Sequence, residues 1–387
     1  MRPSALNRLP VWTFAFAAIV LVALWQWATV AANYSGNWTA LFFTGDLLHH
    51  PPLAGQEHIY SFPNSFGYDG QFYRYIAHDP FLRSDLKSYV DDPRLRYHRI
   101  LLPFLAYALA WGHSERIDPA YGLVCLLSIG LGVYWSCRFA QKAGLNAAWG
   151  LVFLAMPAIP VTMDRLVIDG GMAALTAAFL YYRQSPSWKL FAVLLCAALT
   201  RETGFLLVLA YCVHLVWRRE LRMAGVFLLS AAPAAAWYGY VQSQTAGIHY
   251  SDVWMVPYSA VFWVMAHPLT YPDRPFLAPA ILVADYLAWA GMLLGIGLAF
   301  YRFARKPRDP MQIAAALFAA MASVLQRTDI WANVYAFGRV YTPLLLCLAA
   351  AAAQYRKPWL LTPLAMTLPR LAIQFVPQVW GILRWAA

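Results

Sequence analysis

Long apolar segments, separated by short polar connectors, follow one another along most of the chain. The first, Val11–Asn33, is long enough to cross a bilayer, since a spanning helix needs roughly 20 mostly apolar residues. The later apolar segments are residues 121–137, 147–163, 167–182, 190–199, 204–217, 223–240, 277–301, 311–326, 340–355 and 359–375. This pattern predicts an all-α, polytopic membrane helical bundle with about 10–12 spans. No repeat or low-complexity segment divides it, so we expect one domain, residues 1–387.

One long polar segment, residues 34–99, follows the first apolar run and holds seven acidic residues. No part of it is long enough to span a bilayer, so we expect the whole segment on one face of the membrane. Its short apolar pieces, "WTALFFTGDLL" and "GQFYRYIA", predict helices at the interface, with aromatic side chains among the headgroups. Residues 241–276 are expected to form a second loop on that face.

The N-terminus carries Arg2 and Arg8 and no acidic residue, which predicts that it lies in the cytoplasm. Residues 34–99 are then an extracytoplasmic loop. The first apolar run exceeds the about 7–15 residues of a signal-peptide core, which favours an uncleaved anchor. Cleavage after Ala32 is the alternative.

The connectors between apolar segments are of two kinds. "RFAQKAG", "YRQSPSWK", "WRRELR", "YRFARKPRD" and "YRKP" are basic, whereas "MDRLVID", "TRETG" and "QRTDIWANVYAFGR" mix acids, arginines and aromatics. If the basic set is cytoplasmic, residues 100–112 do not cross the membrane, and residues 190–217 form two short helices that meet at "TRETG". The rival topology makes 190–217 one helix and places Arg201 and Glu202 inside the bilayer, which is costly.

Composition agrees with a membrane protein: 61% of residues are hydrophobic and 12% are charged, against about 25% charged in soluble domains. Lysine and arginine outnumber aspartate and glutamate by 29 to 18, but most basic residues border apolar segments. The positive-inside bias explains this excess, so we expect a lipid bilayer and no nucleic acid as partner. The five cysteines lack metal-ligand spacing, and HExxH, CxxC, Walker and GxGxxG motifs are absent. We therefore expect no cofactor, and nothing in the sequence supports a divalent metal.

Ionisable residues gather on the extracytoplasmic side of this topology. They are Asp69, Asp79, Asp164, Arg165, Asp169, Arg201, Glu202, Asp329 and Arg339. Arginine can hold a phosphate through two hydrogen bonds, and a carboxylate can act as general base toward a hydroxyl. This combination predicts the transfer of a group from a phosphate-bearing donor at a membrane surface.

Each of these residues also has a structural interpretation. Asp69 can cap the helix that follows it, and His78 with Asp79 can form a helix-ending turn before Pro80. Arg165 and Asp169 are spaced i, i+4 and can form a salt bridge within one helix. Tyr68, Phe72 and Tyr73 can anchor the loop at the interface, and Arg201 can pair locally with Glu202. Asp91 and Asp92 can form a solvated turn, and Asp285 can accept a hydrogen bond from the backbone or from Tyr286. His249, Asp252 and His267 can be ordinary loop residues.

Three segments, "GYDGQFYRYIAHDP", "RYHRILLPFLAYALAWG" and "LTRETGFLLVLA", resemble those of bacterial members of the GT-C class of integral membrane glycosyltransferases. The resemblance covers roughly residues 11–217. It implies a polyprenyl-phosphate-linked sugar as donor, an acceptor glycan, lipid or protein, and a site that faces the periplasm from the bacterial inner membrane. The chain departs from the class in lacking a paired-acid motif in the first loop and a soluble C-terminal domain.

The resemblance also implies roles for individual residues. Asp69 matches the first-loop aspartate that acts as general base or orients the acceptor, although Asp46 in "FFTGD" competes for that role. Arg201, with Arg339, is the candidate ligand of the donor phosphate. The remaining candidates for substrate binding are Tyr68, Gln71, Tyr73, Asp79, Arg165, Asp169 and Glu202.

Two other functions remain open. A transporter or flippase of a lipid-linked or anionic substrate would use "TRETG" as a helix break, but transporters often show repeats, and none is detectable. A non-catalytic subunit of a cell-envelope complex would leave Asp69 and Arg201 far apart.

Overall fold

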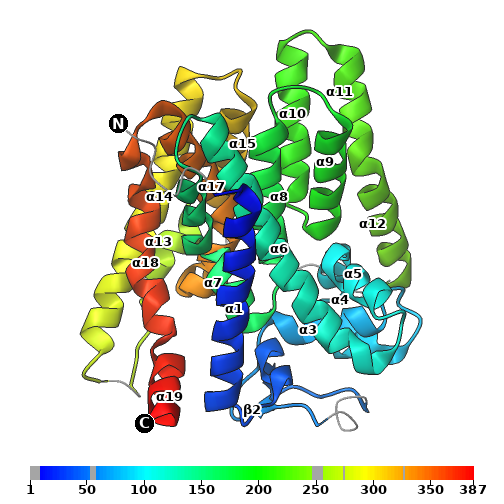
Figure 1. Cartoon of the computed structure of the whole chain (residues 1–387), viewed down its shortest axis with the longest axis vertical. Helices are drawn as coiled ribbons and strands as arrows, with labels where there is room; N and C mark the ends of the chain where they lie inside the picture. The colour runs from blue at the N-terminus through cyan, green and yellow to red at the C-terminus, as the bar shows by residue number, and fades with distance from the viewer. Residues whose placement is uncertain (1–8, 53–57, 246–255, 273–274, 326) are drawn as a thin grey trace.

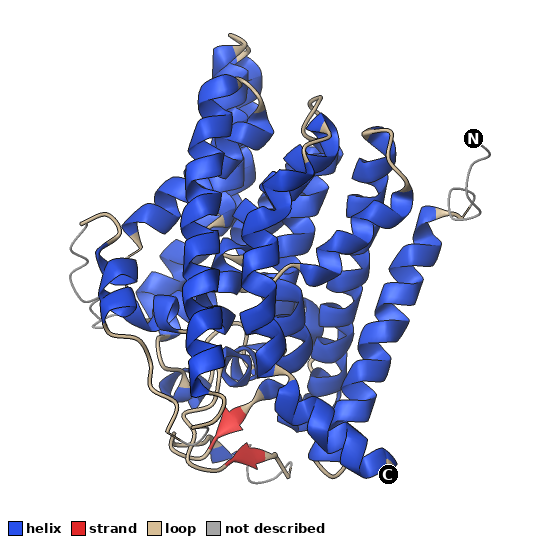
Figure 2. Cartoon of the chain, turned by 90° about the vertical axis from the view of Figure 1, so that its left-hand side faces the viewer, coloured by secondary structure: helices blue, strands red, loops and turns tan. Residues whose placement is uncertain are grey.

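The computed structural model describes residues 9–52, 58–245, 256–272, 275–325 and 327–387. It confirms the predicted all-α helical bundle, since strand structure in the described residues is limited to two short segments. These are β1 (Thr44–Gly45) and β2 (Ser61–Phe62), which pair in parallel over two residues each. Figures 1 and 2 show helices packed side by side along the long axis of the molecule.

Five helices of the described chain are long and apolar enough to cross a membrane. They are α1 (Val11–Asn33), α6 (Ser114–Lys142), the segment Leu221–Gln244, α14 (Ala278–Arg305) and α17 (Val334–Tyr355). Segment Leu221–Gln244 consists of α11 (Leu221–Leu228), η5 (Leu229–Ala231) and α12 (Ala232–Gln244). These long apolar helices indicate an integral membrane protein.

Two further segments pass the same length test only as bent pairs. The first joins η4 (Ala147–Ala155) to α7 (Ala158–Arg165) at 60°, and the second joins η6 (Pro358–Leu361) and α18 (Thr362–Gln374) to α19 (Val376–Ala386) at 49°. The other helices of the bundle are shorter: α8 (Asp169–Tyr182), α9 (Trp188–Thr200), α10 (Gly204–Trp217), α13 (Ser259–Ala266), α15 (Pro310–Val324) and α16 (Thr328–Ala332).

The two conditions of the favoured topology are met. Residues 100–112 hold only α5 (Leu101–Leu109), too short to cross, and Gly112 then turns the chain into α6 with a φ of 72°. Residues 190–217 form two helices, α9 and α10, separated by the three residues between Thr200 and Gly204. Figure 1 shows the α10–α11 connector at the upper end of the bundle, and α3, α4 and β2 at the lower end.

Loop 1, residues 34–99, folds against the lower end of the bundle. The helices in its described part are η2 (Trp38–Phe42), α3 (Asp69–His78), η3 (Asp85–Tyr89) and α4 (Pro93–His98). The predicted interfacial position needs correction for α3, because nine of its ten residues are buried in protein. Tyr73 and Tyr75 are core residues, whereas Trp38 in η2 is half exposed, as an interfacial aromatic would be. Part of the second predicted loop, residues 246–255 with His249 and Asp252, lies outside the described residues.

A close backbone approach at Gly70 holds α3 against the bundle. A Cβ atom there would lie 2.2 Å from the Arg165 carbonyl oxygen and 2.8 Å from that of Phe42. We expect Gly70→Ala to lower the melting temperature in detergent, because forcing atoms into a packed site costs about 1–3 kcal/mol. Gly122→Ala in α6 is the matched control, since nothing lies within 4 Å of its added methyl group. Equal melting of both variants would refute this role for Gly70.

Candidate functional site

Asp69 is held between two arginines from different parts of the chain. Its Oδ2 atom lies 2.7 Å from Arg96 Nη1 in α4 and 2.6 Å from Arg339 Nη2 in α17, and the residue is 8% exposed. Asp69 does not cap α3, because the N-cap residue is Tyr68 and no side chain caps the helix. Its carboxylate is therefore available for ion pairing rather than for capping.

The electrostatic environment keeps Asp69 ionised. Burial alone would raise the pKa of this carboxyl group, but the guanidinium groups of Arg339 and Arg96 outweigh it and hold the pKa well below its usual range. A group with a lowered folded-state pKa stabilises the fold above its unfolded pKa of about 3.9, and this stability is lost as the pH falls. Asp69 is thus a carboxylate at any physiological pH.

Arg339 continues the chain of ion pairs into the bundle. Its Nη1 donates to Asp169 Oδ2 at 3.3 Å, and Asp169, the first residue of α8, also accepts a hydrogen bond from Arg201 Nη1. Arg201 follows α9 in extended conformation, so the break in "TRETG" is what lets its side chain reach α8. The structure thus brings Asp69, Asp169, Arg201 and Arg339 together, as the sequence predicts.

A second arm of the same network returns to loop 1. Arg99 Nε and Nη2 donate to the two Glu202 carboxylate oxygens at 2.9 and 2.7 Å, and Nη1 donates to the Tyr73 hydroxyl at 3.0 Å. Glu202 Oε1 in turn lies 3.5 Å from Arg201 Nε. Arg96 also holds Asp91 through two hydrogen bonds of 2.9 and 2.8 Å.

We call these eight charged residues the ion-pair cluster. Its members are Asp69, Asp91, Arg96, Arg99, Asp169, Arg201, Glu202 and Arg339. Four positive and four negative groups give it no net charge. Asp91, Arg96 and Arg99 were not among the predicted site residues. Their sequence signal is the arginine spacing in "RLRYHR", next to an acidic pair and directly before an apolar segment.

The cluster retains unused hydrogen-bonding capacity. The Tyr68 and Tyr341 hydroxyls and the Nε atoms of Arg201 and Arg339 are buried and have no hydrogen-bond partner among the described residues. Buried polar atoms normally have partners, so these atoms need an explanation such as a bound ligand or water. The Arg339 guanidinium also lies over the Tyr68 ring, 4.8 Å from its centre. Glu202, whose side chain is 36% exposed, connects the cluster to the surface.

Several predicted residues are used elsewhere. Asp46 is exposed and accepts from the Ser65 backbone at 3.3 Å. Asp79 Oδ1 accepts a hydrogen bond from the Arg83 backbone, and its Oδ2 accepts from the Ser84 backbone and hydroxyl. Asp79 therefore forms the helix-ending turn after α3. Gln71 bonds the Gly45 and Phe66 backbones and so fixes loop 1 to α3. Asp329, which sequence analysis grouped with the others, pairs with exposed Arg327.

Arg165 also needs correction, because it forms no i, i+4 pair with Asp169. Leu166, with a φ of 44°, ends α7, so the two residues lie in different helices. Arg165 Nε instead lies 3.0 Å from Asp164 Oδ2, and its guanidinium stacks on Phe43 at 3.3 Å. Asp164 also accepts from the Tyr335 hydroxyl at 3.1 Å. Arg165 therefore belongs to a neighbouring polar group, next to the ion-pair cluster.

Asp285 also binds other partners than those its sequence suggested. Arg370 Nε lies 2.5 Å from Asp285 Oδ1, and the Tyr271 hydroxyl donates to Oδ2 at 2.6 Å. Tyr286, the expected donor, bonds the Met265 carbonyl oxygen instead. Asp285 is thus buried and paired with residues that do not belong to the cluster.

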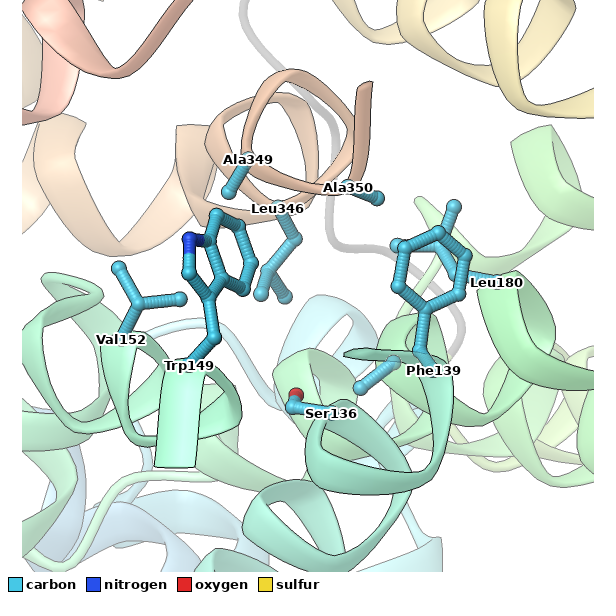
Figure 3. A pocket seen from close by; sticks show the side chains of 9 residues that line it. Ser136, Phe139, Trp149, Val152, Leu180, Leu346, Ala349 and Ala350 are labelled. Atoms are coloured by element: carbon cyan, nitrogen blue, oxygen red, sulfur yellow. The ribbon is translucent and has the colours of Figure 1, made fainter. Parts of the chain in front are cut away.

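Two hollows in the described structure differ in size and lining. A groove of about 500 Å³ lies between α1, η2 and α6. Its lining is mostly apolar, and Asp118 and Gln26 are the polar side chains in it. Asp118 there is bound by Arg74 through hydrogen bonds of 2.7 and 2.9 Å. The cavity in Figure 3, among α6, η4, α8 and α17, has a volume of about 20 Å³. That is room for little more than one water molecule.

The described residues contain no group of three or more histidine, cysteine or acidic side chains placed to hold a metal ion. The ion-pair cluster itself consists of guanidinium and carboxylate groups, with the Tyr68 and Tyr73 side chains in contact with it. No family model, no curated protein and no solved structure matches this chain.

Proposed function

We propose that the protein is a membrane glycosyltransferase that moves a sugar from a polyprenyl-phosphate donor to an acceptor hydroxyl. The reaction would take place at the membrane face that carries loop 1, which we assign to the periplasmic side of a bacterial inner membrane. The observation that carries the proposal is the position of Asp69 between Arg96 and Arg339, with Arg339 joined through Asp169 to Arg201. The likeness of three segments to the GT-C class supports it.

The proposed reaction assigns one role to each kind of group. The acceptor oxygen bonds to the anomeric carbon while the bond from that carbon to the phosphate oxygen breaks. Polyprenyl phosphate leaves with the electron pair, and the acceptor proton passes to Asp69. Arginine stabilises the charge that grows on the leaving phosphate, and the carboxylate orients and deprotonates the hydroxyl.

In the proposed mechanism, donor binding activates Asp69 by drawing Arg339 away from it. A carboxylate with a strongly lowered pKa is a weak base, so Asp69 in its present environment suits orientation better than proton removal. A donor phosphate that recruits Arg339, whose Nε atom is unused, would remove part of the positive charge from Asp69. The pKa of Asp69 would then rise, and the base would become competent only when the donor is bound.

One observation favours a transporter or flippase as second candidate. The chain breaks between α9 and α10 next to a buried arginine, and η4 and α7 meet at a bend of 60°. Broken helices of this kind hold substrate ions in many transporters. The same purified protein can be tested for both activities.

The deciding experiment is incubation of purified protein with a panel of polyprenyl-phosphate sugars labelled in the sugar. We expect one donor to be consumed, with release of polyprenyl phosphate in step with label on an acceptor from an envelope extract. Heat-denatured protein is the control. Movement of intact labelled lipid across vesicles without any loss of the sugar–phosphate bond would refute the transferase and support the transporter.

A further inference from the structure

Arg302, in the last turn of α14, is a buried cation without a counter-ion. The residue is 5% exposed, and its Nε and Nη2 atoms have no hydrogen-bond partner among the described residues. None of the ion pairs found in the described chain includes it, although Arg370 and Arg183, also buried, each have an acidic partner. Burial of an unpaired guanidinium is strongly unfavourable, so a missing anion is the natural explanation.

The surroundings of Arg302 are positively charged. Its guanidinium carbon lies 4.2 Å from the centre of the Tyr355 ring, and Lys306 Nζ lies 4.6 Å from the same ring. The Tyr355 hydroxyl donates to Asp309 Oδ2 at 3.0 Å, and Asp309 Oδ1 lies 3.6 Å from Arg183 Nε.

Asp309 is therefore already shared. It pairs with Arg183, accepts from Tyr355 and also caps α15 by accepting from the Met311 backbone. Arg302 and Lys306 thus both lie against Tyr355, whose hydroxyl donates to an Asp309 carboxylate that already pairs with Arg183. Lys306 is exposed, so the positive charge beside buried Arg302 extends to the surface at the end of α14.

The site lies at the end of the bundle that carries the basic connectors. The segment "YRFARKPRD" runs from the end of α14 into the α14–α15 connector, and "YRKP" begins at the last residue of α17. The α14–α15 connector is at the upper end in Figure 1, opposite loop 1. Basic pockets between helices at the cytoplasmic face typically bind anionic lipid headgroups. A guanidinium with free donors matches phosphate oxygens in geometry and charge.

We propose that Arg302, with Lys306 at the surface, binds a phosphate group at the end of the bundle opposite the ion-pair cluster. The phosphate belongs either to the headgroup of an anionic phospholipid or to free phosphate in solution. The site does not depend on the function proposed for the cluster.

Binding to purified, delipidated protein tests the proposal. The probes are dioctanoyl phosphatidylglycerol, dioctanoyl phosphatidylcholine and inorganic phosphate, followed by calorimetry and by the shift in melting temperature. We expect phosphatidylglycerol to bind and raise the melting temperature, and zwitterionic phosphatidylcholine to bind at least tenfold more weakly. Binding of inorganic phosphate at similar affinity would identify free phosphate as the ligand, and its failure would identify the lipid headgroup. Failure of both phosphatidylglycerol and phosphate to bind the wild type would overturn the proposal.

Variants place the site at Arg302. Arg302→Gln should weaken binding at least tenfold, and Lys306→Gln, at an exposed position with little risk to folding, at least threefold. Arg305→Gln is the matched control, because this exposed arginine of the same turn stacks on Tyr301 and should bind within twofold of wild type. Equal binding by Arg302→Gln and wild type would refute the assignment.

Stability without ligand separates a binding role from a structural one. If Arg302 lacks its counter-ion in the delipidated protein, Arg302→Gln should melt at or above the wild-type temperature. If contact with Tyr355 is instead its purpose, the variant should melt well below the wild type, and the proposal would fail.

Discussion

An Asp69→Asn variant should insert and fold like the wild type and lose about 10²–10⁴-fold in the rate of sugar transfer, the usual contribution of a general base. Asparagine has the shape of aspartate but cannot take up the acceptor proton. Arg96 and Arg339 would keep Asp91 and Asp169 as partners, so neither buried guanidinium would be left without a carboxylate. The measurement is the single-turnover rate with the donor identified from the panel.

Asp46→Asn is the matched control for this prediction. Asp46 lies in the same loop and competes for the same role by its place in the sequence, but it is exposed and bonds only the Ser65 backbone among the described contacts of its carboxylate. We expect its rate to stay within twofold of wild type. A reversed result, with Asp46→Asn inactive and Asp69→Asn active, would transfer the proposed role to Asp46.

The apolar pattern was sufficient to predict an all-α bundle, because lipid and core impose the same requirement on a helix. It did not fix the number of long spans: about 10–12 were expected, whereas five described helices, or seven segments with the bent pairs, are long and apolar enough to cross. Val11–Asn33 was predicted with the bounds of α1, and residues 277–301 correspond to α14. The break at "TRETG" was predictable for an energetic reason, since a continuous helix would carry Arg201 and Glu202 through apolar surroundings.

The pairing of charges was only partly predictable. Topology placed the acids and arginines on one side, but Arg99 and Glu202 are 103 residues apart, and no local pattern connects them. The expected Arg165–Asp169 pair rested on continuous helical geometry, which the left-handed Leu166 interrupts. Short-range spacing is informative only within one unbroken helix.

The position of α3 shows a similar limit. An aromatic-rich amphipathic segment is typical both of an interfacial helix and of a helix buried under other loop elements. In this protein α4, α5 and α6 pack against α3, and Arg74 within α3 binds Asp118 of α6. Burial of α3 is also what gives Asp69 its environment, because a carboxylate at a solvated interface would keep an ordinary pKa.

An Arg339→Gln variant should show the largest loss of stability in the cluster. It removes the cation that joins Asp69 to Asp169 and leaves two buried carboxylates with one arginine less between them. Breaking a buried ion pair in this way typically costs about 3–5 kcal/mol, which unfolding in denaturant with the protein in detergent would measure. Arg327→Gln is the matched control, because the Arg327–Asp329 pair is 62% exposed on both sides and such a pair contributes about 1 kcal/mol or less.

The same variant tests the coupling between Arg339 and the base. Loss of one of the two cations that offset burial should raise the pKa of Asp69. Arg339 and Arg96 hold the pKa of the wild-type Asp69 well below its usual range, so its kcat/KM should show no acidic limb above about pH 4. In Arg339→Gln, Asp69 becomes protonated at a higher pH than in the wild type. The acidic limb of the residual kcat/KM should therefore move upward by at least one pH unit. An unchanged pH profile together with full stability would show that Arg339 does not control Asp69, and donor-triggered activation of the base would have to be abandoned.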